Sequence, residues 1–274
     1  VDEVSRVLVG QEKLVHRMLV GLLTGGHLLI EGVPGLAKTT AVANLAKAIN
    51  TGFQRIQFTP DLLPADLIGT QIYRPKDQAF VVQRGPIFSN LILADEINRA
   101  PAKVQSALLE AMQERQVTIG TETFHLDRPF LVMATQNPVE QEGTYPLPEA
   151  QLDRFMFLIN VDYPSRHEEL NIARTTTAGD LPELDTIIEG ADVLRFQQLV
   201  RRVPVPQHIY EFAVDLVRRT RPSLDESPEW LQPLVSWGAG PRAVQYLILG
   251  ARSRAAIKGS YMTCLLYTSD AADE

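Results

Sequence analysis

Cysteine is almost absent from this sequence. Cys264 is the single cysteine in 274 residues, so a framework of intrachain disulfides is excluded and a reducing, cytoplasmic setting is expected. The five histidines are scattered without the spacing that metal ligands share, which argues against a metal-centred chemistry. No stretch approaches the roughly 20 consecutive apolar residues that a membrane-spanning helix needs. These absences favour a globular protein whose stability depends on its hydrophobic core.

A broad basic surface is also lacking. The formal net charge is −7, from 26 Lys and Arg against 33 Asp and Glu. This balance argues against nucleic acid as a partner, because a nucleic-acid-binding face needs clustered positive charge. The hydrophobic content of 45% and the charged content of 22% are ordinary for a globular protein.

Both ends of the sequence differ from its body. The chain begins at Val1 inside an expected helix, and the segment 263–274 contains "CLLYTSDAADE", which resembles translated sequencing adapter. We therefore expect truncation at both ends and a non-native tail at 263–274. A natural disordered tail is the alternative, since small and acidic residues suit disorder.

Strand and helix patterns alternate through the first part of the chain. Strand patterns lie at 27–31, 53–58, 90–95 and 130–137. Helical spacing follows the first of these strands and recurs at 101–115. This alternation predicts a doubly wound α/β fold, with helices flanking a parallel sheet.

The texture changes after residue 165. Ser165 and Glu168 form a capping-box pattern for a helix near 166–175, and a polar stretch follows. From about 192 the apolar spacing is helical throughout. The sequence therefore predicts an α/β core at 1–165, a linker at 166–191 and a small helical domain at 192–262.

A phosphate-loop pattern directly follows the first expected strand. Such a loop needs backbone N–H groups at a helix N-terminus, a Lys for the β- and γ-phosphates and a hydroxyl for Mg²⁺. Lys38 and Thr39 supply the last two, and the strict G-x-x-x-x-G-K-[ST] pattern fails only at Ala37. A methyl group is tolerated there if residue 37 has entered the helix at negative φ. The candidate nucleotide contacts are Gly32, Val33, Pro34, Gly35, Leu36, Ala37, Lys38, Thr39 and Thr40. The alternative is a generic strand–turn–helix corner.

Two adjacent acids end another buried strand pattern. Asp95 and Glu96 follow "LILA", where a carboxylate is costly unless it finds a partner or water. Asp95 could hold Mg²⁺ with Thr39, and Glu96 could polarise the attacking water of a phosphate hydrolysis. Alternatively, Asp95 caps a turn. Asn137, at the end of a further strand pattern, could position water or report on the γ-phosphate, although Asn before Pro is also a routine turn signal.

The motifs GVPGLAKT, LILADE, ATQNP and LPEAQLDRF, in this order, resemble those of the MoxR family of AAA+ ATPases. The resemblance covers nearly all of residues 1–262, and in this family Ala before the loop Lys is normal. It implies a P-loop NTPase fold with a five-stranded parallel sheet and a C-terminal helical lid.

The same resemblance implies roles for individual residues. Lys38 and Thr39 match the Walker A pair, Asp95 and Glu96 match the Walker B pair, and Asn137 matches sensor 1. Arg154 matches the arginine finger that reaches a neighbouring subunit's nucleotide, Arg242 matches the sensor 2 arginine, and Val9, Gly10 and Gln11 match the segment that flanks adenine. The alternatives are a structural salt bridge for Arg154 and a solvated helix start for Arg242. Arg99 could point across a subunit interface or lie in solvent.

By resemblance, the chain hydrolyses ATP with Mg²⁺ in a homo-oligomeric ring, expected to be a hexamer. Its expected role is chaperone-like maturation or metallation of protein complexes with a von Willebrand A-domain partner. Insertions at 64–88 and 116–126 match hairpins that face the ring pore or a partner, although plain surface loops are the alternative.

Two rival functions stay open. A nucleic-acid motor predicts basic hairpins, whereas 64–88 carries three bases against two acids. A nucleotide-dependent assembly switch predicts that partner activity survives loss of hydrolysis.

Overall fold

The computed structural model describes residues 11–32, 38–76, 78–137, 144–177 and 184–265. Within these ranges the chain forms two compact units. The first contains residues 11–19 and 27–194, and the second contains residues 20–26 and those from 195 onward. Val9, Gly10 and the segment 33–37 lie outside the described residues, as does the end of the expected tail.

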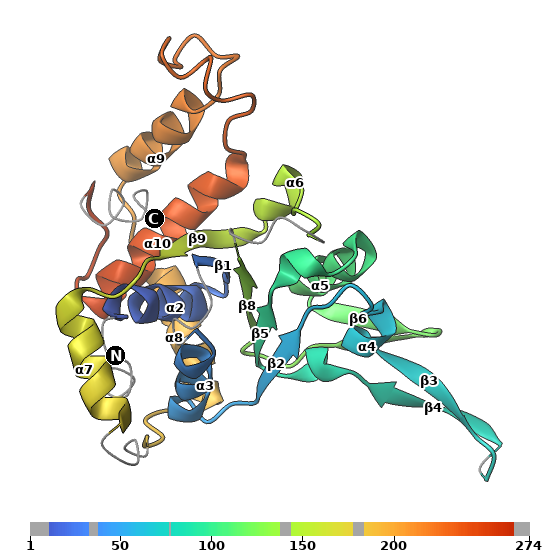
Figure 1. Ribbon diagram of the computed structural model, residues 1–274. Helices are drawn as coiled ribbons and strands as arrows, with labels where there is room; N and C mark the ends of the chain where they lie inside the picture. The colour runs from blue at the N-terminus through green and yellow to red at the C-terminus, as the bar shows by residue number, and fades with distance from the viewer. Residues whose placement is uncertain (1–10, 33–37, 77, 138–143, 178–183, 266–274) are drawn as a thin grey trace. The chain divides into compact units, whose positions relative to one another are not determined.

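A five-stranded parallel sheet forms the centre of the first unit (Figure 1). Its strands, in spatial order, are β2 (Phe53–Gln57), β5 (Leu91–Asp95), β8 (Leu131–Gln136), β1 (His27–Gly32) and β9 (Phe155–Val161). Every neighbouring pair is parallel. The three inner strands are buried almost throughout, which explains why their sequences are apolar runs without alternation. The predicted α/β fold with a five-stranded parallel sheet is confirmed.

Helices connect the strands of this unit. They are α2 (Glu12–Thr24), which continues into the second unit, α3 (Lys38–Ala48), α5 (Ala102–Glu114), α6 (Glu149–Leu152) and α7 (Arg166–Thr177), with single 3₁₀ turns η1 (Pro86–Phe88) and η2 (Ile97–Arg99). Val104, Leu108 and Met112 of α5 recur at helical spacing and pack in one core cluster with Ile92 of β5. Burial of this apolar stripe is what holds α5 against the sheet.

Both predicted hairpins are present. The first is β3 (Gly69–Arg74) with β4 (Ala79–Arg84), preceded by the short helix α4 (Pro64–Ile68), and the second is β6 (Gln116–Ile119) with β7 (Glu122–His125). The guanidinium of Arg84 lies 4.8 Å from the ring centroid of Phe88 and 5.4 Å from that of Phe124. This cation–π stack fastens the base of the first hairpin to the second.

The predicted linker at 166–191 begins with a helix. The N–H of Ser165 donates to Glu168 Oε2 at 2.7 Å, and the N–H of Glu168 donates to Ser165 Oγ at 3.4 Å. This reciprocal pair is the capping box that the sequence indicated, and α7 follows it.

The second unit contains most of α8 (Gly190–Arg202), and all of α9 (Gln207–Arg219) and α10 (Pro241–Ile257). The expectation of continuous helical structure from 192 is wrong between 220 and 240, where the chain forms turns and bends. Pro222, Pro228 and Pro233 interrupt that segment, because proline lacks the N–H that an interior helical position must donate. No helix in the described part of the chain is long and apolar enough to cross a membrane.

Candidate nucleotide site

Gly32 ends β1 where the phosphate-loop pattern begins. A methyl group added at this residue would lie 2.6 Å from the carbonyl oxygen of Val161 in β9. The two backbones therefore approach too closely for any side chain, and glycine is required by packing as well as by the loop pattern. The predicted contacts of Val33, Pro34, Gly35, Leu36 and Ala37 lie outside the described residues and stay predictions, as do those of Val9 and Gly10.

Lys38 is the first residue of α3, and Thr39 and Thr40 follow in its first turn. The Lys38 Nζ donates to the carbonyl oxygen of Gly32 at 2.6 Å. Burial lowers the pKa of Lys38 from its usual value, and the charges of Asp95 and Glu96 counteract this shift. The ammonium group is thus held at the start of a helix, within electrostatic range of both acids.

Asp95 is the last residue of β5, and both of its carboxylate oxygens are engaged. Oδ1 accepts a hydrogen bond from the Thr135 hydroxyl at 2.6 Å. Oδ2 accepts from Arg55 Nη2 at 2.6 Å and from Arg55 Nε at 3.0 Å. Thr135 Oγ1 in turn accepts from the N–H of Glu96 at 2.8 Å. Asp95 is therefore fixed from two neighbouring strands, β8 on one side and β2 on the other.

Glu96 adopts a backbone conformation that is uncommon for a residue with a side chain. Its φ of 57° and ψ of 51° are in the left-handed region, which is costly for a residue with a side chain. The carboxylate Oε2 accepts from Gln57 Nε2 at 2.7 Å and pairs with Arg99 Nε at 3.1 Å. Arg99 thus forms an ion pair with Glu96 of its own chain.

Sequence reasoning missed three of these residues: Arg55, Gln57 and Thr135. Arg55 and Gln57 lie two apart on β2, so the alternation of "FQRIQF" places them on one face of that strand. Arg55 Nη2 also donates to Gln57 Oε1 at 2.9 Å, which joins the two into one polar cluster. Arg55 and Gln57 reach the two carboxylates only because β2 pairs with β5, and a local sequence pattern does not reveal which strands pair.

The remaining candidates occupy separate places. Asn137 directly follows β8 and is 8% exposed, at the edge of the sheet where the strands β1, β5 and β8 end. Arg154 lies in the turn between α6 and β9, and Gln11 immediately precedes α2. Arg242 is the second residue of α10, in the second unit. The residues that the structure brings together are Lys38, Asp95 and Glu96.

This set of groups fits a magnesium nucleotide. Mg²⁺ prefers hard oxygen ligands, and the Thr39 hydroxyl and the Asp95 carboxylate provide them at the ends of α3 and β5. The N-terminus of α3 adds backbone N–H groups and a partial positive charge, which favour phosphate. The start of α3 thus offers a cation and a hydroxyl, and the end of β5 offers two carboxylates, at one edge of the sheet.

Comparison with known proteins gives a consistent answer. Residues 27–157 match the family described as "ATPase family associated with various cellular activities (AAA)". The protein named Chaperone MoxR1 of Mycobacterium tuberculosis is 52% identical over 257 residues, which cover 94% of this chain and 68% of that protein. The Bacillus subtilis protein YeaC is 45% identical over 256 residues, or 93% of this chain and 77% of YeaC. A solved structure of a candidate ATPase from Cytophaga hutchinsonii, 47% identical, superimposes with a TM-score of 0.90 over 99% of this chain and 82% of that one.

Proposed function

Because this chain belongs to the MoxR family of AAA+ ATPases, we propose that it binds ATP with Mg²⁺, hydrolyses ATP to ADP and phosphate, and uses the energy for chaperone-like remodelling of other proteins. The observation that carries this proposal is the meeting of Lys38 with Asp95 and Glu96 at the carboxyl edge of the sheet.

The roles of the site residues follow from their chemistry. Lys38 binds the β- and γ-phosphates, and Thr39 and Asp95 hold the metal ion. Bound Mg²⁺ supplies positive charge to the phosphate oxygens. Glu96 orients and polarises the attacking water. Asn137 is proposed as sensor 1, at the strand end beside the two acids.

Two arginines complete the proposed machinery. Arg154 acts as the arginine finger of a neighbouring subunit, where it stabilises the charge that develops on the transferred phosphoryl group. Arg242 acts as the sensor 2 arginine. Both roles rest on the match of their motifs to the family.

The side-chain contacts of the two acids compete with their proposed roles. Arg55 occupies Oδ2 of Asp95, and Gln57 with Arg99 occupies Oε2 of Glu96. The hydrogen bonds from Arg55 to Asp95 Oδ2 must break before that oxygen can bind a metal ion. The hydrogen bond from Gln57 to Glu96 must break before Glu96 can bind a water. We therefore propose that binding of the metal nucleotide displaces these contacts.

The assembly that we propose is a homo-oligomeric ring, expected to be a hexamer, that works in the cytoplasm with a von Willebrand A-domain protein and matures metal-containing complexes. The name of the Mycobacterium relative supports the chaperone role. The first hairpin offers a contact for such partners, since Tyr73 and Phe80 are 50% and 68% exposed and their rings pair at 5.3 Å. Exposed paired aromatics at the end of a hairpin suit a protein surface better than nucleic acid phosphates.

Lys38→Ala, with Lys47→Ala as its control, tests the nucleotide site. Lys47 is exposed near the other end of the same helix. We expect Lys38→Ala to weaken binding of a fluorescent ATP analogue at least tenfold, because it removes the phosphate cation, while Lys47→Ala binds as the parent does. Anisotropy titration with Mg²⁺ present measures both. If Lys38→Ala bound the ATP analogue as the parent does, with an unchanged melting temperature, the assignment of Lys38 to the nucleotide site would be wrong.

A further inference from the structure

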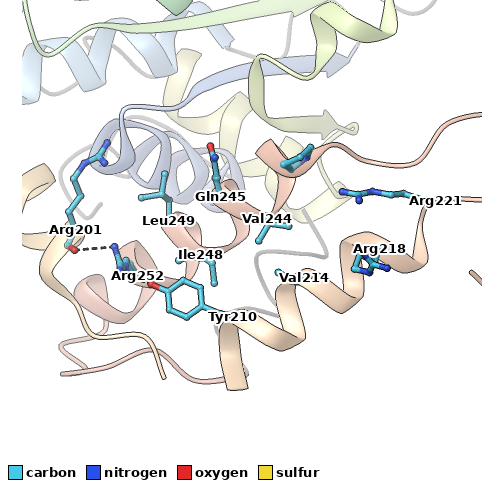
Figure 2. Close-up of a pocket in the computed structure, with 11 residues that line it drawn as sticks. Arg201, Tyr210, Val214, Arg218, Arg221, Val244, Gln245, Ile248, Leu249 and Arg252 are labelled. Atoms are coloured by element: carbon cyan, nitrogen blue, oxygen red, sulfur yellow. Dashed lines mark hydrogen bonds between the residues drawn. The ribbon is translucent and has the colours of Figure 1, made fainter. Parts of the chain in front are cut away.

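A groove between α9 and α10 belongs to the second unit and plays no part in the nucleotide chemistry above. Its volume is about 580 Å³, within the range of ligand-binding clefts. Figure 2 shows aliphatic side chains along its middle and arginines at both ends. Its lining residues are Arg201, Tyr210, Val214, Arg218, Arg221, Pro241, Val244, Gln245, Ile248, Leu249 and Arg252.

The apolar part of the groove is incompletely covered. Val214 is 39% exposed and Tyr210 is 37% exposed, although both lie on the face of α9 that meets α10. Beneath them lies a cluster of buried Ile209, Ala213 and Ile248. Val214, Val244 and Leu249 are partly exposed and gain from burial against another apolar surface, whereas Ile248 is already buried.

The arginines at the ends are held in place by neutral acceptors. Arg252 donates from Nη1 to the carbonyl oxygen of Arg201 at 3.0 Å and from Nη2 to the Tyr210 hydroxyl at 3.2 Å. Arg221 Nε donates to the carbonyl oxygen of Ala239 at 3.0 Å. Guanidinium groups fixed in this way lose little conformational entropy when they bind an anion.

Acidic groups compensate only part of this charge. Arg218 pairs with Glu226 through two hydrogen bonds of 2.7 and 2.8 Å. Glu226 also lies within electrostatic range of Arg221. Among the described residues, Arg201 and Arg252 form no ion pair, and no acid lines the groove. The groove is therefore basic although the chain as a whole carries a net charge of −7. Such local charge attracts a partner of opposite sign.

We propose that this groove binds an acidic amphipathic helix of a partner protein. Tyr210 and Arg218 are eight positions apart, and Pro241 and Arg252 are eleven positions apart, so the groove is about 12 to 17 Å long at 1.5 Å per residue. Two to three turns of helix fit that length. An apolar stripe covers Val214, Val244 and Ile248, as in helix-in-groove recognition. Carboxylates at the two ends of the helix accept bidentate hydrogen bonds from the arginines.

A synthetic peptide tests the proposal in the full chain. The probe is a fluorescein-labelled helix of roughly 14 residues, with leucines at helical spacing in its middle and glutamates in its first and last turns. A second peptide has lysine in place of each glutamate. Fluorescence anisotropy measures binding of both to the parent chain and to Arg201→Glu and Arg221→Glu.

Matched controls lie beside each tested arginine. Arg202 and Arg219 are exposed on the same helices as Arg201 and Arg218 and do not line the groove. We expect Arg201→Glu and Arg221→Glu each to weaken binding of the glutamate peptide at least fivefold, while Arg202→Glu and Arg219→Glu change it less than twofold. The double variant of Arg201 and Arg221 should bind the lysine peptide instead, which shows that the groove is still folded. Lys38→Ala should bind the glutamate peptide as the parent does, so failure of the nucleotide site is distinguishable from failure of the groove.

Three outcomes overturn the proposal. The first is absence of binding by the parent chain. The second is that the control variants weaken binding of the glutamate peptide as much as the groove variants do, which would mean that the peptide is attracted by positive charge in general. The third is self-association of the parent that Arg201→Glu abolishes in sedimentation velocity, which assigns the groove to a second copy of the chain.

Discussion

The two units of this protein bury their apolar residues to very different extents. In the sheet unit, β1, β5 and β8 are almost completely buried, and one core cluster extends from Leu29 through α5 to Phe155. In the described part of the helical unit, the cluster between α9 and α10 has three buried members, and Trp230 and Trp237 are 68% and 79% exposed. The closed core can hold reacting groups in fixed positions, whereas the open helical surface is available for recognition.

The largest predicted difference between the two units is in the loss of stability when a leucine is replaced by alanine. Leu93 of β5 is fully buried, so Leu93→Ala should lower the free energy of unfolding by about 2 to 5 kcal/mol. Leu249 of α10 is partly exposed beside the groove, and Leu249→Ala should cost about 1 kcal/mol. Hydrogen-exchange mass spectrometry resolves the two units separately. Equal losses of hydrogen-exchange protection in the two variants would contradict the difference in burial between the two units.

A buried histidine gives the sheet unit a pH dependence of its own. Val132 N–H donates to His27 Nδ1 at 3.0 Å, and His27 Nε2 lies 3.2 Å from the carbonyl oxygen of Met112. Burial lowers the pKa of His27 from 6.5 to about 4, because the charged ring is poorly solvated there.

The sign of this linkage follows from the depressed pKa of His27. Between about pH 4 and 6.5 the unfolded chain binds the proton and the folded chain does not. Stability is therefore fully present above pH 6.5 and falls by up to about 3 kcal/mol as the pH drops to 4. Urea unfolding at several pH values measures this slope, and His27→Gln should reduce it. An unchanged slope in His27→Gln would assign the dependence to other groups.

The smallest predicted effect tests whether the ion pair of Arg55 with Asp95 competes with metal binding at Asp95. Arg55 is half exposed, and an exposed ion pair is worth about 1 kcal/mol or less. Arg55→Gln should therefore lower the Mg²⁺ concentration needed for nucleotide binding by about three- to fivefold. Gln54→Ala, on the same strand, is the control and should have no effect. A higher Mg²⁺ requirement in Arg55→Gln would show that Arg55 assists metal binding instead.

Much of the fold was predictable because it rests on local patterns. Apolar runs marked the inner strands, and the alternation around Gly120 marked the second hairpin. The fifth strand, β9, was expected as a member of the sheet but not located. The helical spacing on either side of 220–240 does not indicate the break between them, which the prolines of that segment explain.

The candidate site was predictable in part for the same reason. Lys38 lies shortly after one recognisable strand, and Asp95 and Glu96 lie at the end of another. Arg55 and Gln57 were missed because their partners depend on the pairing of β2 with β5. The basic groove was also invisible, since its arginines come from three separate helices and the turn that follows α9. Local sequence patterns predict helices and strands. The contacts of Arg55 and Gln57 and the basic groove depend instead on how those elements pack together.

Single-turnover hydrolysis by Glu96→Gln tests the central claim most directly. The substitution keeps a side chain that can hydrogen-bond to Gln57 and Arg99 but removes the carboxylate that polarises water. We predict ATP binding within about threefold of the parent and hydrolysis reduced by about 10² or more. Remodelling of a client should stall together with hydrolysis, whereas an assembly switch would keep its partner activity. Hydrolysis by Glu96→Gln at the parent rate would contradict the account.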